Sequence, residues 1–175
     1  MSEHNENYNV VEIFNWYRQF SHQNIDLRFL PDHNAFCKVP EEDFRTFEAQ
    51  TKLRLPDIYK QFLLEVGEGR LKQDRLDRVI DANLNYFLGP ESIAELMSKE
   101  TEEWKIYPEF TDDDEIPFFD LGSASVFTFC PSIGPETAVW RPNKFKLIAN
   151  SFVEFLALLR EDIEFYNTYG RSLNS

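Results

Sequence analysis

The stretch from Glu115 to Cys130, EIPFFDLGSASVFTFC, constrains the fold of this chain more than any other. It contains two apolar runs, Ile116–Leu121 and Val126–Cys130, with Gly122–Ser125 between them. Aromatic and β-branched runs of this length favour strands, and a Gly/Ser connection favours a tight turn. The stretch therefore predicts a β-hairpin within a larger sheet.

The order of side chains in this hairpin predicts how its faces are covered. Because side chains alternate across a strand, Phe127 and Phe129 are expected on one face of the sheet. The opposite face would carry Val126, Thr128 and Cys130. In the first strand Phe118 and Phe119 are adjacent, which predicts that both faces of that strand are covered.

Five segments carry apolar residues at helical spacing and predict helices that cover the sheet. They are a helix over about Tyr8–Ser21, one that begins at Pro40, one from Pro56 to Val66, one that begins at Gly89–Ser92, and one after Ser151. Gly67-Glu68-Gly69 is expected to end the third of these helices. Ser151 and Glu154 predict a capping box, in which each side chain accepts a hydrogen bond from the backbone amide of the other residue.

Further strands are predicted at Asn85–Leu88, Thr137–Arg141 and Phe145–Ala149, with a short one at Leu27–Leu30. Leu71–Ile80 has alternating charges and is expected to form a solvated loop or a short strand. The chain has 175 residues and no internal repeat, so we expect a single globular domain. Its expected class is α+β, with helices packed around a mainly antiparallel (mixed) sheet.

Within this single domain we expect three parts. Residues 1–39 would form an N-terminal helix and a variable extension, residues 40–165 the main domain, and residues 166–175 a C-terminal tail. The start of the chain is acidic and polar and lacks the pattern of a signal peptide, so a cytoplasmic location is expected. Cys37 and Cys130 are then expected to be reduced thiols, with Cys130 in the core.

The net charge of −13 is the strongest global signal. It makes nucleic acid an unfavourable partner, because phosphate contacts need a basic surface. Anionic membrane surfaces are disfavoured for the same reason. A basic protein partner is favoured, although an acidic composition also serves solubility alone, and the charge balance does not separate these two interpretations.

Motifs for catalysis, cofactors and metals are not found in the sequence. Glycine-rich phosphate loops and nucleophile elbows are absent, and Ser123 and Ser125 are read as turn residues. The three histidines are not at metal-ligand spacing, and Cys37 has no Cys-x-x-Cys partner. We therefore expect no enzyme activity, no cofactor and no metal, and the one cluster that could still do chemistry is Asp112–Glu115.

Acidic residues are concentrated between Glu100 and Glu115, and aromatic residues lie among them. The run Asp112–Glu115 is open to three interpretations: a solvated loop, a docking patch for a basic partner, or an ion site. Trp104, Tyr107 and Phe110 suit a protein interface, in which aromatic residues supply affinity and charges supply steering, or else the edge of the core.

Three landmarks occur in the same order as in the SMI1/KNR4 (SUKH) superfamily. LRLPDIYKQFLLEVGEG resembles the Leu-Pro helix of that family, and EIPFFDLGSASVFTFC resembles its central strands. TAVW followed by SFVEFLALL resembles its closing strand and final helix. The resemblance spans about Pro40–Glu161. The chain departs from the family pattern at Gly67-Glu68-Gly69, where Asn-Gly-Gly is usual, and at Gly122–Ser125, where Gly-Gly-Asp is usual.

The resemblance implies an SMI1/KNR4-like α+β fold without enzyme activity. Bacterial members of the family are mostly immunity proteins that bind a cognate toxin, often a nuclease, of polymorphic or contact-dependent toxin systems. Fungal members are instead scaffolds in cell-wall synthesis and signalling, which is the alternative function. For the first role, the residues expected to bind a basic toxin domain are Glu102, Glu103, Trp104, Tyr107, Glu109, Asp112, Asp113, Asp114 and Glu115.

Overall fold

The computed structural model describes residues 8–27, 33–72, 84–110, 112–144 and 146–168. Its α-helices are α1 (Val10–Arg18), α2 (Glu41–Thr51), α3 (Asp57–Glu65), α4 (Pro90–Ser98), α5 (Phe152–Glu161) and α6 (Phe165–Thr168). Short 3-10 helices are η1 (Trp104–Ile106), η2 (Pro131–Ile133) and η3 (Pro142–Lys144).

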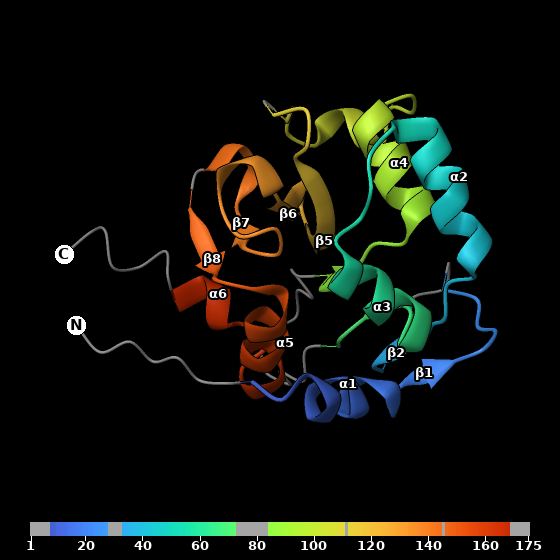
Figure 1. Ribbon diagram of the computed structural model, residues 1–175, viewed down its shortest axis with the longest axis vertical. Helices are drawn as coiled ribbons and strands as arrows, with labels where there is room; N and C mark the ends of the chain where they lie inside the picture. The colour runs from blue at the N-terminus through green and yellow to red at the C-terminus, as the bar shows by residue number, and fades with distance from the viewer. Residues whose placement is uncertain (1–7, 28–32, 73–83, 111, 145, 169–175) are drawn as a thin grey trace.

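The strands form an eight-stranded sheet in the order β1 to β8. They are β1 (Ser21–His22), β2 (Ala35–Cys37), β3 (Glu68–Arg70), β4 (Tyr86–Phe87), β5 (Ile116–Gly122), β6 (Ser125–Phe129), β7 (Val139–Trp140) and β8 (Leu147–Ala149). The β1–β2 pair is parallel, and the other neighbouring pairs are antiparallel. In Figure 1 α2 lies beside α4, and α1 lies beside α5. The predicted α+β class with a mainly antiparallel sheet is confirmed.

The predicted hairpin is confirmed as β5 and β6, with Gly122 opposite Ser125. Ser123 and Ala124 connect the strands with φ angles of 52° and 58°. Positive φ at both central residues is the geometry of a two-residue turn whose twist matches that of the strands. Every residue of β5 is buried.

A β-bulge at Phe118 changes how the hairpin meets the helices. The register pairs Pro117 with Thr128 and Phe119 with Phe127, so Phe118 is an extra residue in β5. Both phenylalanines consequently contact Phe155 of α5, with ring centroids 5.6 Å and 5.1 Å from it. The prediction that both faces of this strand are covered is confirmed, since every residue of β5 is buried. Strict alternation would place the two rings on opposite faces, but the bulge lets both of them reach α5.

The other predicted strands at Asn85–Leu88, Thr137–Arg141 and Phe145–Ala149 are confirmed in shorter form as β4, β7 and β8. One face of the sheet is aromatic and meets the helices. Cross-strand pairing aligns on it Phe36, Phe87, Phe119 and Phe127. Phe62 of α3 packs on Phe36 and Phe87, and Phe14 of α1 packs on Phe62. This face and its helices form the core.

Tyr59 of α3 is the polar anchor of this core. Its side chain is fully buried, and its hydroxyl donates to the carbonyl oxygens of Leu88 at 2.7 Å and Phe118 at 3.0 Å. Burial raises the pKa of this hydroxyl well above its ordinary value. The ring of Tyr59 also packs edge-on against Phe152 of α5 at 5.2 Å. One side chain thus connects α3, β5 and α5.

The five predicted helices are confirmed in α1 to α5. Pro40 and Pro56 precede α2 and α3, and three acidic residues occupy the first turn of α2, where they complement the helix dipole. At α5 the Ser151 hydroxyl accepts from the amide of Glu154, as expected. The Glu154 carboxylate, however, accepts from the amide of Asn150, one residue before the expected donor.

The strands β1, β2 and β3 were not predicted, because pieces of two or three residues are too short for a pattern of alternation. Helix α3 ends just before Gly67, as expected, and Gly69 lies within β3, where it pairs with Phe36 of β2. Their φ angles are 120° and 148°, and a Cβ at either position would lie about 2 Å from a carbonyl oxygen of β2. Only glycine fits this close approach.

Two predictions lie wholly or mainly outside the described residues. The expected strand at Leu27–Leu30 falls largely in 28–32, and most of Leu71–Ile80 falls in 73–83. The expected tail begins at Tyr166, which lies inside α6 and is buried, with its hydroxyl hydrogen-bonded to Asn85. In the part of the chain that is described, every helix is too short or too polar to cross a membrane.

Candidate functional site

The acidic segment, residues 100–115, follows α4 and is tied to it by a single lysine. Lys99 donates to the carbonyl oxygens of Tyr107 and Pro108, and its Nζ lies 3.8 Å from Oε1 of Glu109. The side chain of Lys99 is largely buried, with 12% of its area exposed. A buried cation here offsets part of the negative charge and fixes the path of the segment.

The carboxylates of the acidic segment divide into an exposed group and an inward group. The exposed group consists of Glu100, Glu102, Glu103, Glu109 and Asp113. Glu102 forms an ion pair with Lys105 in the same segment. Pairs of this kind are exposed to solvent and leave the carboxylates accessible to a partner.

The inward group has structural roles. Asp114 accepts hydrogen bonds from the backbone amide and the hydroxyl of Ser132, at 2.7 Å and 2.9 Å. Glu115 is completely buried, and its Oε1 accepts from the Thr128 hydroxyl and from the Asn143 amide. Asp112 is half-buried, and its carbonyl oxygen accepts from the amide of Glu115. Of the predicted partner-binding residues, Glu115 therefore does not reach the surface.

We expect Glu115→Ala to lower the free energy of unfolding by about 2 kcal/mol or more, because a buried hydroxyl and a partly buried amide lose their acceptor. Glu115→Gln should lower it less, since the amide oxygen can still accept. The measurement is urea unfolding followed by circular dichroism. Asp113→Ala is the matched control, because Asp113 is exposed and its removal should change stability little. Equal effects at the two positions would contradict the structural role of Glu115.

Trp104 and Tyr107, the two aromatic residues among the predicted partner-binding residues, lie side by side. The rings of Trp104 and Tyr107 are 5.3 Å apart, and both side chains are half-buried. The Tyr107 hydroxyl donates to Oδ2 of Asp120 at 2.8 Å. Burial, together with the neighbouring Asp120 carboxylate, raises the pKa of Tyr107. Tyr107 therefore fastens the segment to strand β5, with Trp104 beside it.

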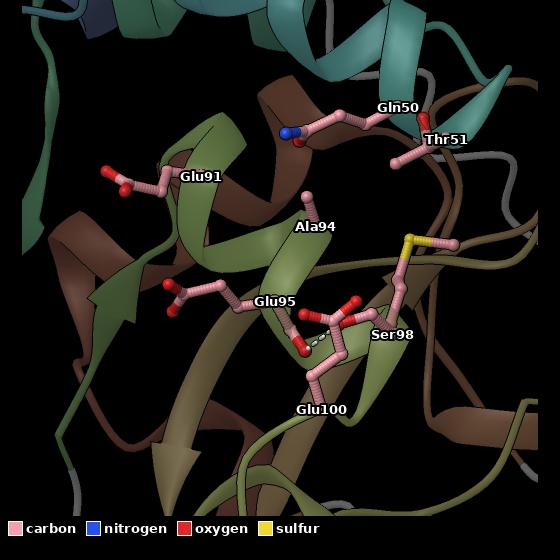
Figure 2. A pocket seen from close by; sticks show the side chains of 8 residues that line it. Gln50, Thr51, Glu91, Ala94, Glu95, Ser98 and Glu100 are labelled. Carbon is pink, nitrogen blue, oxygen red and sulfur yellow. Dashed lines mark hydrogen bonds between the residues drawn. The ribbon is translucent and has the colours of Figure 1, made fainter.

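A groove between α2 and α4, here called the helical groove, has a volume of about 620 Å³. It is lined by Gln50, Thr51, Glu91, Ala94, Glu95, Met97, Ser98 and Glu100. Figure 2 shows Glu91 and Glu95 projecting from α4, with Glu100 just beyond its end and Gln50 opposite on α2. None of these described lining residues is a lysine or arginine. The groove adds its carboxylates to those of the adjoining acidic segment.

A second groove, here called the sheet groove, lies on the face of the sheet opposite the aromatic core and has a volume of about 510 Å³. Strands β3, β4 and β5 contribute Glu68, Tyr86 and Asp120, and the acidic segment contributes Glu103, Trp104 and Tyr107. Cross-strand pairing places Tyr86 directly opposite Asp120. The groove therefore brings together residues that are far apart in the sequence.

Glu68 and Asp120 are the acids of the sheet groove whose pKa values are raised. Burial raises the pKa of Glu68 to about 7, and the charges of Asp43 and Glu91 act in the same direction, while a hydrogen bond from the amide of Gly89 opposes them. Burial also raises the pKa of Asp120, against hydrogen bonds from the Gly122 amide and the Tyr107 hydroxyl. Glu68 thus changes charge near neutral pH.

Raised carboxyl pKa values inside a groove are also found in catalytic sites. Here both oxygens of Asp120 accept hydrogen bonds from the protein, and no histidine is among the described residues that line the groove. Among the described residues, no group of three or more His, Cys, Asp or Glu side chains is arranged to hold a metal ion. The arrangement suits the binding of a cationic group.

Sequence reasoning did not identify Glu68, Asp120 or the helical groove. Asp120 gives a local signal, because it is a charged residue in an otherwise apolar strand. Glu68 gives a weaker one, since it stands between two glycines that were read only as a helix end. The helical groove gives no such signal, because it depends on how α2 and α4 pack.

A protein-family model matches most of the chain. A family model described as "SMI1 / KNR4 family (SUKH-1)" matches residues 38–158. The match covers α2 to α4, most of α5, the acidic segment and the whole helical groove. It also covers the sheet groove except for Ile25, Asp26, Leu27 and Cys37. No curated protein matches the chain.

Proposed function

The chain belongs to the SMI1/KNR4 family (SUKH-1), and we propose that it is a non-catalytic immunity protein that binds and neutralises a basic toxin domain. The family includes immunity proteins. The toxin would belong to a bacterial polymorphic or contact-dependent toxin system and would often be a nuclease. The proposed site of action is the cytoplasm.

The observation that carries this proposal is the concentration of carboxylates along α4 and in the segment that follows it. Glu91, Glu95 and Glu100 line the helical groove, and the exposed acids of the segment continue from there. A nuclease needs a basic surface to hold phosphates. An acidic surface would be steered to that same basic surface and would cover it, which blocks the substrate without any chemistry.

The proposed contact surface consists of the helical groove and the exposed members of the predicted set. Those members are Glu102, Glu103, Glu109 and Asp113, with Trp104 at the inner edge. Asp112 and Asp114 are half-buried, so they would contribute to the shape of this surface more than to direct contacts with the toxin. Glu115 is left out, since it is fully buried.

The first test is capture of the toxin. The chain is immobilised and exposed to the protein encoded by the adjacent gene, and the toxic activity of that protein is then measured with and without the chain. Specific binding that abolishes toxicity supports the proposal. Binding without loss of toxicity would favour the alternative, a regulatory scaffold of the cell-wall-signalling type.

The second test reverses charge in the helical groove. We expect Glu95→Lys with Glu100→Lys to slow association with the toxin domain about 10-fold at low salt, because the steering potential is weakened. The difference should shrink at high salt, where surface charges are screened. Stopped-flow or surface plasmon resonance gives the rate.

The matched control for this charge reversal is Glu136→Lys with Glu161→Lys. These two glutamates are exposed, lie outside the helical groove and the acidic segment, and give the same change in net charge. Equal slowing by both double variants would mean that only net charge matters, and it would remove the helical groove from the proposed surface.

A further inference from the structure

The sheet groove is built on the polar face of the sheet. On the aromatic face, pairing aligns Phe36, Gly69, Phe87 and Phe119. Because side chains alternate, the neighbouring row on these strands points the other way and contains Arg70, Tyr86 and Asp120. Glu68 precedes Arg70 by two residues and shares its face. On this face Asp120 is buried and Glu68 is half-buried. Acidic side chains are seldom buried unless they are paired.

Aromatic rings form one wall of this groove. Trp104 and Tyr107 lie 5.3 Å apart, and Tyr107 is held in place by its hydrogen bond to Asp120. Tyr86 lines the floor from β4. The faces of tryptophan and tyrosine rings attract cations within about 6 Å of the ring centre. The chain already uses this contact nearby, since Nζ of Lys99 lies 6.0 Å from the ring of Phe110.

Glu68 supplies a carboxylate between these rings and the start of α4. Its Oε2 accepts from the amide of Gly89 at 3.0 Å, a role that a glutamine could fill equally well. Four titratable groups on the packed elements interact electrostatically with Glu68: Asp43 of α2, Tyr59 of α3, Tyr86 of β4 and Glu91 of α4. Within the sheet, Cys37 is the cross-strand neighbour of Glu68, and Arg70 lies two residues along β3. None of the described residues lining the groove is basic. A carboxylate in this setting is costly unless a cation joins it.

We propose that the sheet groove receives a basic side chain of the protein partner, arginine in preference to lysine, between the rings of Trp104 and Tyr107 and the carboxylates of Glu68 and Glu103. Arginine is favoured because its planar guanidinium stacks on aromatic rings and pairs with carboxylates at the same time. The partner's basic character rests on the proposed function. The groove's preference for a guanidinium rests on the residues that line it.

The proposal predicts a dependence on pH. Because the pKa of Glu68 is about 7 in the free protein, its carboxyl group is mostly neutral at pH 6 and mostly charged at pH 8. A cation binds the charged form better, so affinity for a guanidinium should rise between these two values. Removal of the titrating group by Glu68→Gln should flatten this dependence.

The experiment uses capped arginine amide as the probe and its uncharged isostere, capped citrulline amide, as the matched ligand. Trp104 is made the only tryptophan by Trp16→Phe and Trp140→Phe, and its fluorescence reports binding in the full chain. A single amino acid of this size is expected to bind with a dissociation constant on the order of 1 mM. Circular dichroism checks that each variant is folded.

The expected results distinguish binding of arginine in the sheet groove from attraction of arginine by the net negative charge of the protein. Arginine amide should bind at least about 10-fold more tightly than citrulline amide at pH 8, and Glu68→Gln should weaken arginine binding about 5-fold or more. Glu136→Gln is the control with the same change in charge at an exposed residue outside both grooves and the acidic segment, and it should leave binding nearly unchanged. Trp104→Phe, followed by NMR in place of fluorescence, should weaken binding less than Trp104→Ala.

Three outcomes would overturn the proposal: equal binding of citrulline and arginine, unchanged arginine binding in Glu68→Gln, or equal weakening by Glu68→Gln and Glu136→Gln. The probe needs no toxin, so this test and the test of the proposed function fail separately. Arginine binding in the groove without capture of a toxin would contradict the immunity role alone. Capture of a toxin whose affinity Glu68→Gln does not change would contradict the groove alone.

Discussion

Replacement of Tyr59 by alanine is expected to lower the free energy of unfolding by about 3–5 kcal/mol, the range for loss of a large buried aromatic side chain. The ring of Tyr59 contacts Phe62, Phe118, Phe129 and Phe152, and its hydroxyl joins α3 to the carbonyl oxygens of Leu88 and Phe118. This loss is a large fraction of the about 5–15 kcal/mol by which a small domain is stable.

Tyr59→Phe separates the two contributions, because it keeps the ring and removes only the hydroxyl. It should cost about 1–3 kcal/mol, since two buried carbonyl oxygens lose a donor. Urea unfolding followed by circular dichroism measures both variants. The control is Ile106→Ala, since Ile106 is a large apolar residue with 70% of its area exposed. A loss at Ile106 as large as that at Tyr59 would contradict the assignment of Tyr59 to the centre of the core.

Glu68→Gln is expected to stabilise the protein at pH 8, by about 1–3 kcal/mol after allowance for partial solvent exposure. The pKa of Glu68 rises from an ordinary 4.5 to about 7 on folding. The folded chain therefore binds this proton more tightly than the unfolded chain. The resulting stabilisation is fully present below pH 4.5 and is lost as the pH rises through about 7, so the wild-type protein should become less stable across this window.

The glutamine variant lacks the titrating group and should show a flatter profile over the same window. Chemical unfolding at pH 5, 6, 7 and 8 gives the comparison, with Glu100→Gln as an exposed control. The two profiles of wild type and Glu68→Gln should converge at the acid end. A variant that is less stable than wild type at pH 8 would show that the charged form of Glu68 is stabilised by the fold, contrary to its raised pKa. A gain in stability on removal of Glu68 would fit a residue retained for binding.

Much of the fold could be predicted from local patterns. The apolar runs on either side of Gly122–Ser125 are long enough to define a hairpin, and helical spacing defines α1 to α5. The bulge at Phe118 could not be predicted, because it depends on which residue of β6 faces which residue of β5. The strands β1 to β3 were missed since each is stabilised by its neighbours and has no pattern of its own.

Less of the candidate site than of the fold could be predicted from the sequence. The acids from Asp112 to Glu115 look alike in the sequence, yet Asp113 is exposed and Glu115 is buried beneath Thr128 and Asn143. Which carboxylates point outward is decided by the entry into β5. The sheet groove combines residues of β3, β4, β5 and the acidic segment, and no window of the sequence contains them together.

The bulge at Phe118 also bears on how the chain acquires its structure during synthesis. Two adjacent rings of the central hairpin close on Phe155, which belongs to the last long helix of the described chain. While α5 is still inside the ribosome, Phe118 and Phe119 lack their contact with Phe155. The hairpin then exposes apolar surface, so a nascent chain of this protein is expected to depend on chaperones until α5 has emerged.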